Sequence, residues 1–350
     1  IEYAGSPVEL PPGFPRERVA GWAVPGMVDL HSHVVSEGFG DINDMVLPVN
    51  AGLSTRPAIV PANDAIRLAC ASGVTTLFLI PGSGTSLSGF GVLLKTRTEG
   101  GYERAVLADP GGMKVAQTHN PERRGGDLGA TRAGLYWLLA ESNARARGQL
   151  ARGPAGGARD FDLANLERVH ARELPVLVHC AGNDGVEKVV RMWKQENGTR
   201  CVVSHGPFDG WTIAPFVAEQ GVPVNNGPRT FDYPYTRTGR MTGTAAEYVA
   251  AGVPDFSLNT DAPVIPAEEL FLQGSMSARL GADSYTMLRA LTIHPARAFG
   301  IDDRVGSLEP GKHADVVVYS GDPLDPRSRV ELVLIEGEEQ YRRTAGGQWF

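Results

Sequence analysis

The sequence predicts an α/β protein, a (β/α)8 TIM barrel with a small β unit built from both chain ends. Eight candidate strands follow one another over roughly 235 residues, from Met27 to Asp261, and most are followed by a loop and a helix. Polar residues stand at the carboxyl ends of several of these strands. Two further strand patterns come after the barrel is complete.

The composition is that of an ordinary globular protein. The chain has 350 residues, 42% of them hydrophobic, with a net charge of -7 and a pI near 5.7, so it can bury a large core. Its charge offers no basic footprint for nucleic acid, and no run of 18 apolar residues could span a bilayer. We therefore expect a small-molecule substrate, with neither nucleic acid nor membrane as a partner; a homo-oligomer stays open.

The cysteines and the first residue bear on the compartment. Cys70, Cys180 and Cys201 are odd in number and lack C-x-x-C spacing, which argues against a disulfide framework and favours small buried residues. The chain starts at Ile1 rather than Met, and we expect an amino-terminal piece to have been removed. A cytoplasmic location stays open, and so does a periplasmic or secreted one if that piece included a signal peptide.

The first predicted strand is the apolar run that ends in His31 and His33. Because side chains alternate along a strand with a period of two, both imidazoles lie on one face. Imidazole nitrogen is a preferred ligand of zinc and its first-row neighbours. The pair predicts half of a metal site.

The elements after it alternate. The run at 74–80 is continuously apolar and β-branched and ends at Pro81-Gly82, which is typical of a buried strand. Further strands are predicted at 91–95, 113–116, 175–180, 200–205, 222–225 and 255–261, and helices at about 63–72, 131–147, 163–172, 184–197, 211–220 and 244–251. Doubly wound sheets alternate in the same way, so the rhythm alone leaves both architectures open.

The polar residues at the strand ends favour the barrel, because the carboxyl ends of barrel strands open onto one face. In the sixth strand, Cys201, Val203 and His205 share one face, so we expect His205 to end an apolar row that faces inward. The residues that would converge are His31, His33, Lys114, His179, His205 and Asp261.

The chain ends are expected to form a separate small domain. Residues 1–24 are rich in Pro and Gly with short strand-like pieces, and 314–319 and 330–335 are strong strand patterns. The predicted division is a barrel at 25–307 and a small β domain from 1–24 and 308–350, its amino-terminal part incomplete.

Over nearly its whole length the chain resembles the metal-dependent amidohydrolase superfamily. The motifs are Pro25-Gly26-Met27-Val28-Asp29-Leu30-His31-Ser32-His33, Val178-His179, Ser204-His205-Gly206, Thr260-Asp261-Ala262-Pro263-Val264, His294-Pro295-Ala296-Arg297-Ala298-Phe299-Gly300 and residues 306–318. The last segment resembles the return of that superfamily into a β-sandwich. Residues 112–116, 120–121 and 261–266 are most similar to imidazolonepropionase-like members.

The resemblance implies a binuclear hydrolase of a C–N bond in an amide, cyclic amide or dipeptide-like substrate, in which a hydroxide bridging two divalent ions, zinc above all, attacks. His31 and His33 would hold the buried ion, and His179 and His205 the more exposed one. Lys114 would be carboxylated by carbon dioxide and bridge the ions, because an ammonium has no lone pair. Asp261 would be the catalytic residue, binding metal and passing a proton to the leaving nitrogen.

Substrate contacts are expected from the loops. Arg229 and Tyr233, after the seventh strand, could bind a substrate carboxylate, and Asn183 follows the fifth strand into the pocket. His119 stands where the family usually has an acidic residue, and Ala262 where it has a His, which bears on specificity. Residues 82–86 resemble a backbone nest for anions but lack the nucleotide-loop signature, which favours a plain loop.

Two other readings stay open. A mononuclear deaminase or imidazolonepropionase-type hydrolase would not need Lys114 as a bridge. Deaminase members often place a Glu three residues after the histidine of the fifth strand, where this chain has Gly182. The other is a catalytically silent barrel, but the intact set of histidines and Asp261 argues against it. About two, one or no metal ions per chain would separate the three readings.

Overall fold

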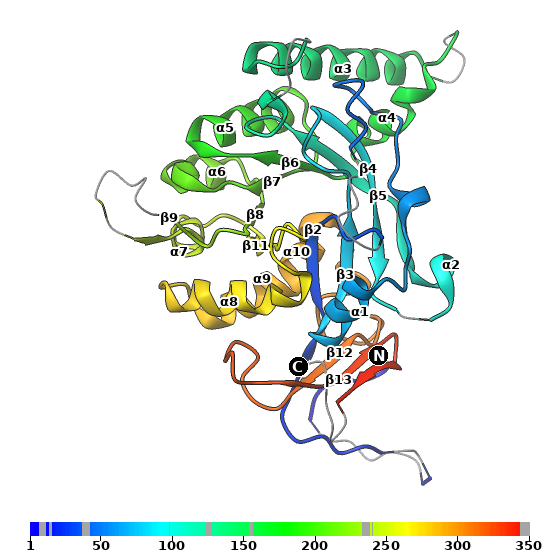
Figure 1. Ribbon diagram of the computed structural model, residues 1–350, viewed down its shortest axis with the longest axis vertical. Coiled ribbons are helices and arrows are strands. Elements are labelled where there is room, and N and C mark those ends of the chain that lie inside the picture. Colours follow the sequence, from blue (N-terminus) through cyan, green and yellow to red (C-terminus); the bar gives the residue numbers. More distant parts are fainter. Residues whose placement is uncertain are drawn as a thin grey trace.

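An eight-stranded sheet, nearly closed into a barrel, forms the centre of the molecule (Figure 1). The computed structural model describes residues 1–6, 12–13, 16–36, 43–97, 99–123, 128–153, 157–232, 239 and 241–343. In sequence order the strands are β2 (Met27–Ser32), β3 (Val74–Leu79), β4 (Leu87–Lys95), β5 (Val106–Ala116), β6 (Val176–Cys180), β7 (Cys201–His205), β8 (Val224–Asn226) and β11 (Ser257–Leu258). In space they follow the order β11-β8-β7-β6-β5-β4-β3-β2.

The two edge strands of this sheet meet. Ser32, at the end of β2, forms a parallel bridge with Ala262, just after β11. The amide of His33 donates to the carbonyl of Ala262 at 2.7 Å. The predicted α/β class and the count of eight strands are confirmed, and the arrangement is consistent with a TIM barrel.

The expected order of strand, loop and helix is wrong at the third strand. β4 pairs antiparallel with both β3 and β5, whereas the other pairings within this sheet are parallel. The cause is the short connection, because only residues 80–86 separate β3 from β4. A parallel crossover needs a dozen or more residues, so the chain returns along β3 instead.

Helices cover the outside of the sheet. Their bounds are α1 (Asp64–Ala71), α2 (Gly101–Ala105), α3 (Arg132–Arg152), α4 (Ala164–His170), α5 (Gly182–Val189), α6 (Ala214–Glu219), α7 (Thr244–Ala250), α8 (Leu270–Arg279), α9 (Ser284–Leu291) and α10 (Ile293–Phe299). Shorter turns are η1 (Arg56–Ala58), η2 (Pro121–Arg123), η3 (Phe161–Leu163), η5 (Phe208–Ile213) and η6 (Ala267–Glu269), and the π-helical η4 (Val190–Glu196) continues α5. Side chains of Asn63, Thr131 and Asp283 accept amide hydrogens at the starts of α1, α3 and α9, which fixes these boundaries.

Two apolar cores sit on either side of the barrel wall. The larger one packs sheet residues such as Val203 against helix residues such as Leu139. The second joins Val28 and Leu30 of β2 to inward residues of neighbouring strands and to Phe299 of α10, which plugs one end. The barrel interior is therefore filled with side chains below the carboxyl ends of the strands.

A second, four-stranded antiparallel sheet lies below the barrel in Figure 1. It has the order β1-β12-β13-β14, with β1 (Trp22–Pro25), β12 (Val316–Tyr319), β13 (Val330–Ile335) and β14 (Glu338–Arg342). The pairing of β1 with β12 brings residues from both parts of the chain together. The parts of the chain with a described structure contribute this one sheet here, so a sandwich and the domain division stay predictions.

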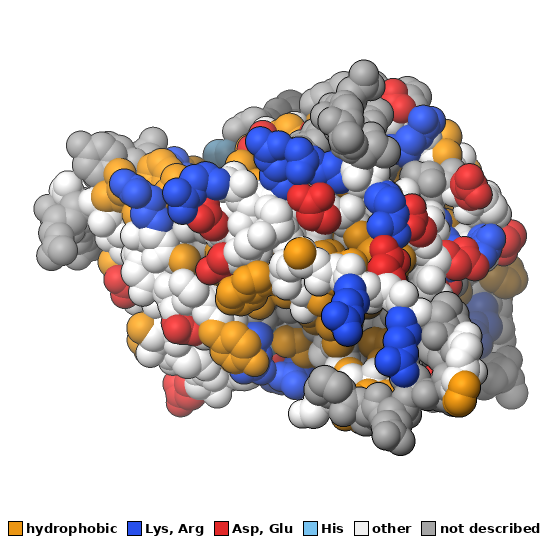
Figure 2. Space-filling view, turned by 90° about the horizontal axis from the view of Figure 1, so that it is seen from below, with side chains coloured by type: hydrophobic (Ala, Val, Ile, Leu, Met, Phe, Trp, Pro, Cys, Tyr) orange, Lys and Arg blue, Asp and Glu red, His pale blue; other side chains and the backbone are white. Residues whose placement is uncertain are grey.

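Three smaller observations complete the fold. β9 (Phe231–Asp232) and β10 (Thr242–Gly243) form a short antiparallel pair beside α7. Figure 2 views the molecule from below, where the small sheet lies, and shows basic and acidic side chains interspersed around apolar ones. Among the described helices, none has both the length and the apolarity to cross a membrane.

Candidate metal centre

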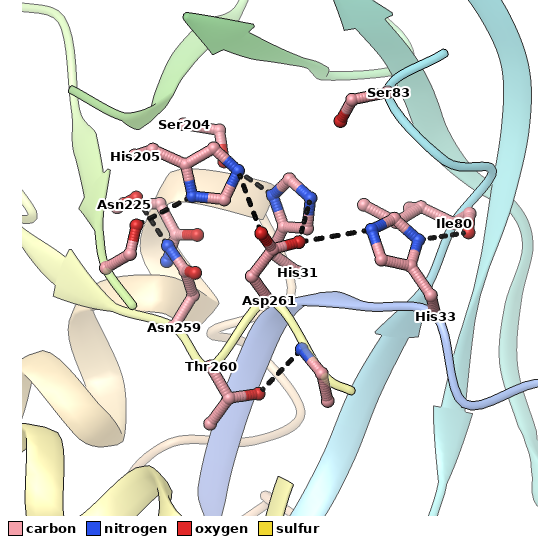
Figure 3. Close-up of polar contacts among 12 residues, drawn as sticks. His31, His33, Ile80, Ser83, Ser204, His205, Asn225, Asn259, Thr260 and Asp261 are labelled. Atoms are coloured by element: carbon pink, nitrogen blue, oxygen red, sulfur yellow. Dashed lines mark hydrogen bonds and ion pairs between the residues drawn. The ribbon is translucent and has the colours of Figure 1, made fainter. Parts of the chain in front are cut away.

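Polar side chains from separate strands meet at one end of the barrel (Figure 3). They form two groups of three whose candidate ligand atoms all lie within 4.8 Å of one another. One group is His31, His179 and His205, and the other is His31, His33 and Asp261. His31 belongs to both, so the two groups adjoin.

A bulge in β2 directs His31 into the barrel. Val28 and Leu30 already face the interior core, so strict alternation would turn His31 to the other side. The pairing of β2 with β3 shifts register between Asp29 and Ser32. The shift corresponds to one extra residue in β2, which changes the direction of the side chains after it. Bulges of this kind are common beside active sites. The shared face of His31 and His33 was predicted, but the bulge was not.

His205 and Asp261 reach the cluster through unusual backbone conformations. Their φ angles are 70° and 51°, in the left-handed region that costs a non-glycine residue about 1–2 kcal/mol. The prediction that His205 ends an inward row with Cys201 and Val203 is wrong, because these two pack against the helices while Val202 faces the interior. Backbone strain like that of His205 and Asp261 clusters at functional sites.

Asp261 lies at the centre of the second group. Its Oδ1 is 3.2 Å from His33 Nε2 and 3.3 Å from His31 Nε2, and its Oδ2 is 3.9 Å from His205 Nε2. The amine of Lys114 lies 3.1 Å from His31 Nε2. Five of the six predicted ligands are thus linked by direct contacts, and His179 joins them through the first group.

Each contacting histidine is held from behind by its other nitrogen. His33 Nδ1 donates to the carbonyl of Ile80 at 3.0 Å, and His205 Nδ1 donates to that of Gly227 at 2.7 Å. His31 Nδ1 lies 2.6 Å from Ser204 Oγ. Because a carbonyl can only accept, Nδ1 is the protonated nitrogen in both rings, and in the neutral His205 ring Nε2 carries the lone pair that a metal needs.

Two of the rings are short of partners. Both nitrogens of His179 and Nε2 of His205 are buried without a hydrogen bond among the described residues. Buried polar atoms are otherwise nearly always paired, and leaving one unpaired is unfavourable. Divalent metal would supply the missing partner, so the residues present fit such an ion.

Burial sets the charge state of the cluster. It lowers the pKa of His31, His179 and His205 below the ordinary value, so these rings are neutral. It also lowers the pKa of Lys114 to about 7. Burial opposes the ionisation of Asp261, but His205, His33 and Lys114 together outweigh it and the pKa of Asp261 falls. Neutral imidazoles beside a carboxylate are the form that binds zinc.

Asp29 is a buried carboxylate that was not singled out from the sequence. Its Oδ1 accepts from the amide of His31 at 2.9 Å and its Oδ2 from the hydroxyl of Thr260 at 2.6 Å. Burial raises the pKa of Asp29 to about 7. The residue ties β2 to the segment that carries Asp261, and an acidic residue inside an apolar run was the signal for it.

A cavity of about 290 Å³ opens beside the strand end that carries His179. Its lining is Thr118, His119, Arg132, Ala181, Gly182, Asp184, Phe208 and Asp209. Arg132 pairs there with Glu122 and Asp184. Arg132 had no predicted role, and His119, five residues after Lys114, was singled out only as a departure from the family pattern.

Of the three predicted substrate contacts, the structure describes Arg229 and Asn183. The guanidinium of Arg229 lies 5.5 Å from the ring centre of Phe208, which lines the cavity. The side-chain amide of Asn183 donates to Thr212 at 3.4 Å, and Asn183 is not among the lining residues. Tyr233 lies outside the described residues.

Comparisons with known proteins agree on one family. A model described as "Amidohydrolase family" matches residues 138–341. The solved structure of an amidohydrolase from Thermotoga maritima MSB8 has a TM-score of 0.87 and 31% identity, covering 98% of this chain and 93% of that one. A Xaa-Pro dipeptidase with bound methionine has a TM-score of 0.53 at 17% identity, over 91% and 86% of the two chains, which shows the fold alone.

Among curated relatives, the amidohydrolase tasK of Hapsidospora irregularis is 26% identical over 90% of this chain. The chain spans 36% of that relative's length.

Proposed function

The chain belongs to the amidohydrolase family, whose members are hydrolases of C–N bonds, and from that premise we propose that it is a binuclear metal-dependent enzyme. Its substrate would carry an amide, cyclic amide or dipeptide-like bond. The observation that carries the proposal is the pair of adjoining ligand groups that share His31, with the buried amine of Lys114 beside them. A single ion would need only one such group.

The proposed ligands are His31, His33, His179, His205, Asp261 and Lys114, the last as a carbamate. Nitrogen and carboxylate oxygen in this combination suit zinc. When bound, two such ions would lower the pKa of water and polarise the scissile carbonyl. A carbamate forms from a neutral amine, and the lowered pKa of Lys114 supports that reaction near neutral pH.

Asp261 is proposed as the residue that moves the proton. Its carboxylate lies within 3.3 Å of two imidazoles and is partly open to solvent, so it can accept a proton from attacking water and return it to the leaving nitrogen. The low pKa of Asp261 keeps it ionised before the attack. Asn183, Arg229 and Tyr233 stay the proposed substrate contacts, and the contact of Arg229 with Phe208, which lines the cavity, supports Arg229 in that role.

The test separates proton transfer from metal binding. Purified protein should lose hydrolysis of N-acyl amino acids, dipeptides or cyclic amides when chelated, and regain it with zinc. Asp261→Asn should retain most of its metal, because an amide oxygen still faces the ions, and lose about 10²-fold or more in kcat. The matched control is Asp303→Asn, which changes an exposed carboxylate. Full activity of chelated protein, or of Asp261→Asn, would contradict the proposal.

A further inference from the structure

We propose that the hydroxyl groups of Ser83 and Ser86 form a seat for the carboxylate that Lys114 acquires from carbon dioxide. This inference rests on the proposed function and adds the residues that hold the modified lysine. Both serines belong to the connection between β3 and β4, whose sequence resembles an anion nest.

Ser83 contacts Lys114 directly. Its Oγ accepts from the amine of Lys114 at 2.8 Å, and the residue is only 8% exposed. Figure 3 shows the Ser83 hydroxyl projecting from its loop toward the histidine cluster. Lys114 forms no ion pair with the described residues, so its polar contacts there are the hydroxyl of Ser83 and the ring of His31.

Ser86 supplies a second hydroxyl on the same side. Its carbonyl accepts from the amide of Ala116 at 2.9 Å, which places it opposite Ala116 across the antiparallel β4–β5 pair. Residues opposite one another project to the same face, and Ala116 shares the face of Lys114, two residues away. Ser86 is 1% exposed, and its Oγ has no hydrogen-bond partner in the described part of the chain.

The chemistry of the modification explains why two hydroxyls belong there. The lone pair of the neutral Lys114 amine attacks the carbon of carbon dioxide, an N–C bond forms, and one C–O π pair moves onto oxygen. The amine then releases one proton to solvent. The Lys114 amine, a hydrogen-bond donor, has become a carbamate with two acceptor oxygens. The hydroxyl of Ser83 can rotate and so change from accepting to donating. Charge-assisted bonds from Ser83 and Ser86 would hold these oxygens.

The experiment follows the carbamate itself. Zinc-loaded protein is titrated with ¹³C-bicarbonate, and the carbamate resonance is measured for the wild type, Ser83→Ala, Ser86→Ala and the double variant. We expect the double variant to need about tenfold more bicarbonate for half its signal, in line with the loss of a charged hydrogen bond. Ser83→Thr, which keeps a hydroxyl, should stay near wild type.

Ser88→Ala is the matched control, because Ser88 follows on β4 and its hydroxyl donates to the carbonyl of Thr85. It should titrate like wild type. If the double variant shows the bicarbonate dependence of the wild type, the proposed role of Ser83 and Ser86 is wrong, while the proposal that Lys114 bridges two ions still stands. A wild-type protein with no carbamate resonance would overturn the proposed function first, and the seat with it.

Discussion

His31 depends on a side chain that lies on the far side of its ring from Asp261. Ser204 Oγ is 2.6 Å from Nδ1, while Nε2 faces Lys114 and Asp261. Partners behind a ligand typically contribute 10–100-fold to metal affinity. We expect Ser204→Ala to bind zinc about 10–100-fold more weakly in competition with a chromophoric chelator.

The control for that variant is Ser275→Ala, which removes a hydroxyl from α8, where it bonds to the carbonyl of Leu324. This protein should bind zinc as the wild type does. Equal zinc affinity of Ser204→Ala and wild type would show that the ring of His31 is held by packing alone.

His170, at the end of α4, predicts how stability depends on pH. Burial, reinforced by Arg147, lowers the pKa of His170 to about 4, and neither ring nitrogen has a hydrogen-bond partner among the described residues. In the unfolded chain the pKa is about 6.5, so between pH 6.5 and 4 the unfolded state binds more protons. Stability is lost as pH falls through that window.

The substitution His170→Gln should remove this loss of folding stability at low pH. The measurement is the free energy of unfolding of both proteins in urea at pH 7 and pH 4.5, and we expect the difference to move in favour of the variant at the lower pH. An identical difference at both values would mean that His170 titrates alike in the folded and unfolded chains.

The identities of the candidate ligands could be predicted from the sequence, because an H-x-H pair and histidines that close apolar runs are local patterns. Their directions could not. His31 needs a bulge in β2, and His205 and Asp261 need positive φ angles, and neither feature has a sequence signal in a non-glycine residue. Asp29 was missed, and the segment of Ser83 was interpreted as a plain loop, because a serine or aspartate gains its role only from residues far along the chain.

At the scale of elements, the turn after β8 holds His205 in place. Gly227, whose carbonyl receives His205 Nδ1, has φ +139°, and a Cβ there would lie 2.3 Å from the carbonyl oxygen of Asn259. Gly221 has φ +62° with nothing within 4 Å of such a Cβ. Gly221→Ala should therefore cost about 1–2 kcal/mol of folding free energy.

Gly227→Ala adds a backbone overlap to the strain. We expect it to lose more than about 3 kcal/mol in urea unfolding and to weaken zinc binding as well, because the carbonyl that orients His205 must move. Similar losses in the two variants would mean that the close approach of Gly227 to Asn259 is easily relieved.

Element types were largely predictable, since continuous apolar runs and helical spacing are properties of neighbouring residues. The predicted helix at 63–72 became α1 with Asn63 as its cap, and the run at 74–80 became β3. Strand direction was not predictable at β4, because an apolar pattern reads the same both ways. Only the short connection, residues 80–86, carried that information, and the prediction that the third strand begins at Gly91 lengthened it to residues 81–90.

At the scale of the molecule, buried charges join the barrel to the small sheet. Lys95, at the end of β4, forms an ion pair with Asp315, just before β12, and both side chains are buried. Breaking one side of such a pair typically costs 3–5 kcal/mol, because the other charge is left buried. Lys95→Met should lose about that much.

A second substitution tests the reason for this loss. Asp315→Asn keeps the oxygen that accepts from the amide of Glu336 but removes the charge. Added to Lys95→Met, it should recover at least half of the lost unfolding free energy in urea. A double variant less stable than Lys95→Met would point to packing of the lysine chain rather than to the buried charge.

The pairing of distant chain segments was foreseen for β1 and β12, since strand patterns after a completed barrel must pair elsewhere. The closure of the barrel through Ser32 and Ala262 was not foreseen, because it depends on which strands become neighbours. The cavity beside His179 could not be predicted either, since it is assembled from four separate segments of the chain.

The account depends most on Lys114 as a bridge between two metal ions. The most direct test is the metal content per chain of purified wild type and Lys114→Ala, measured by elemental mass spectrometry after loading with zinc and bicarbonate. We expect about two ions in the wild type and one or fewer in the variant, with acetate or propionate restoring part of the second. Two ions in Lys114→Ala, or one in the wild type, would contradict the binuclear mechanism.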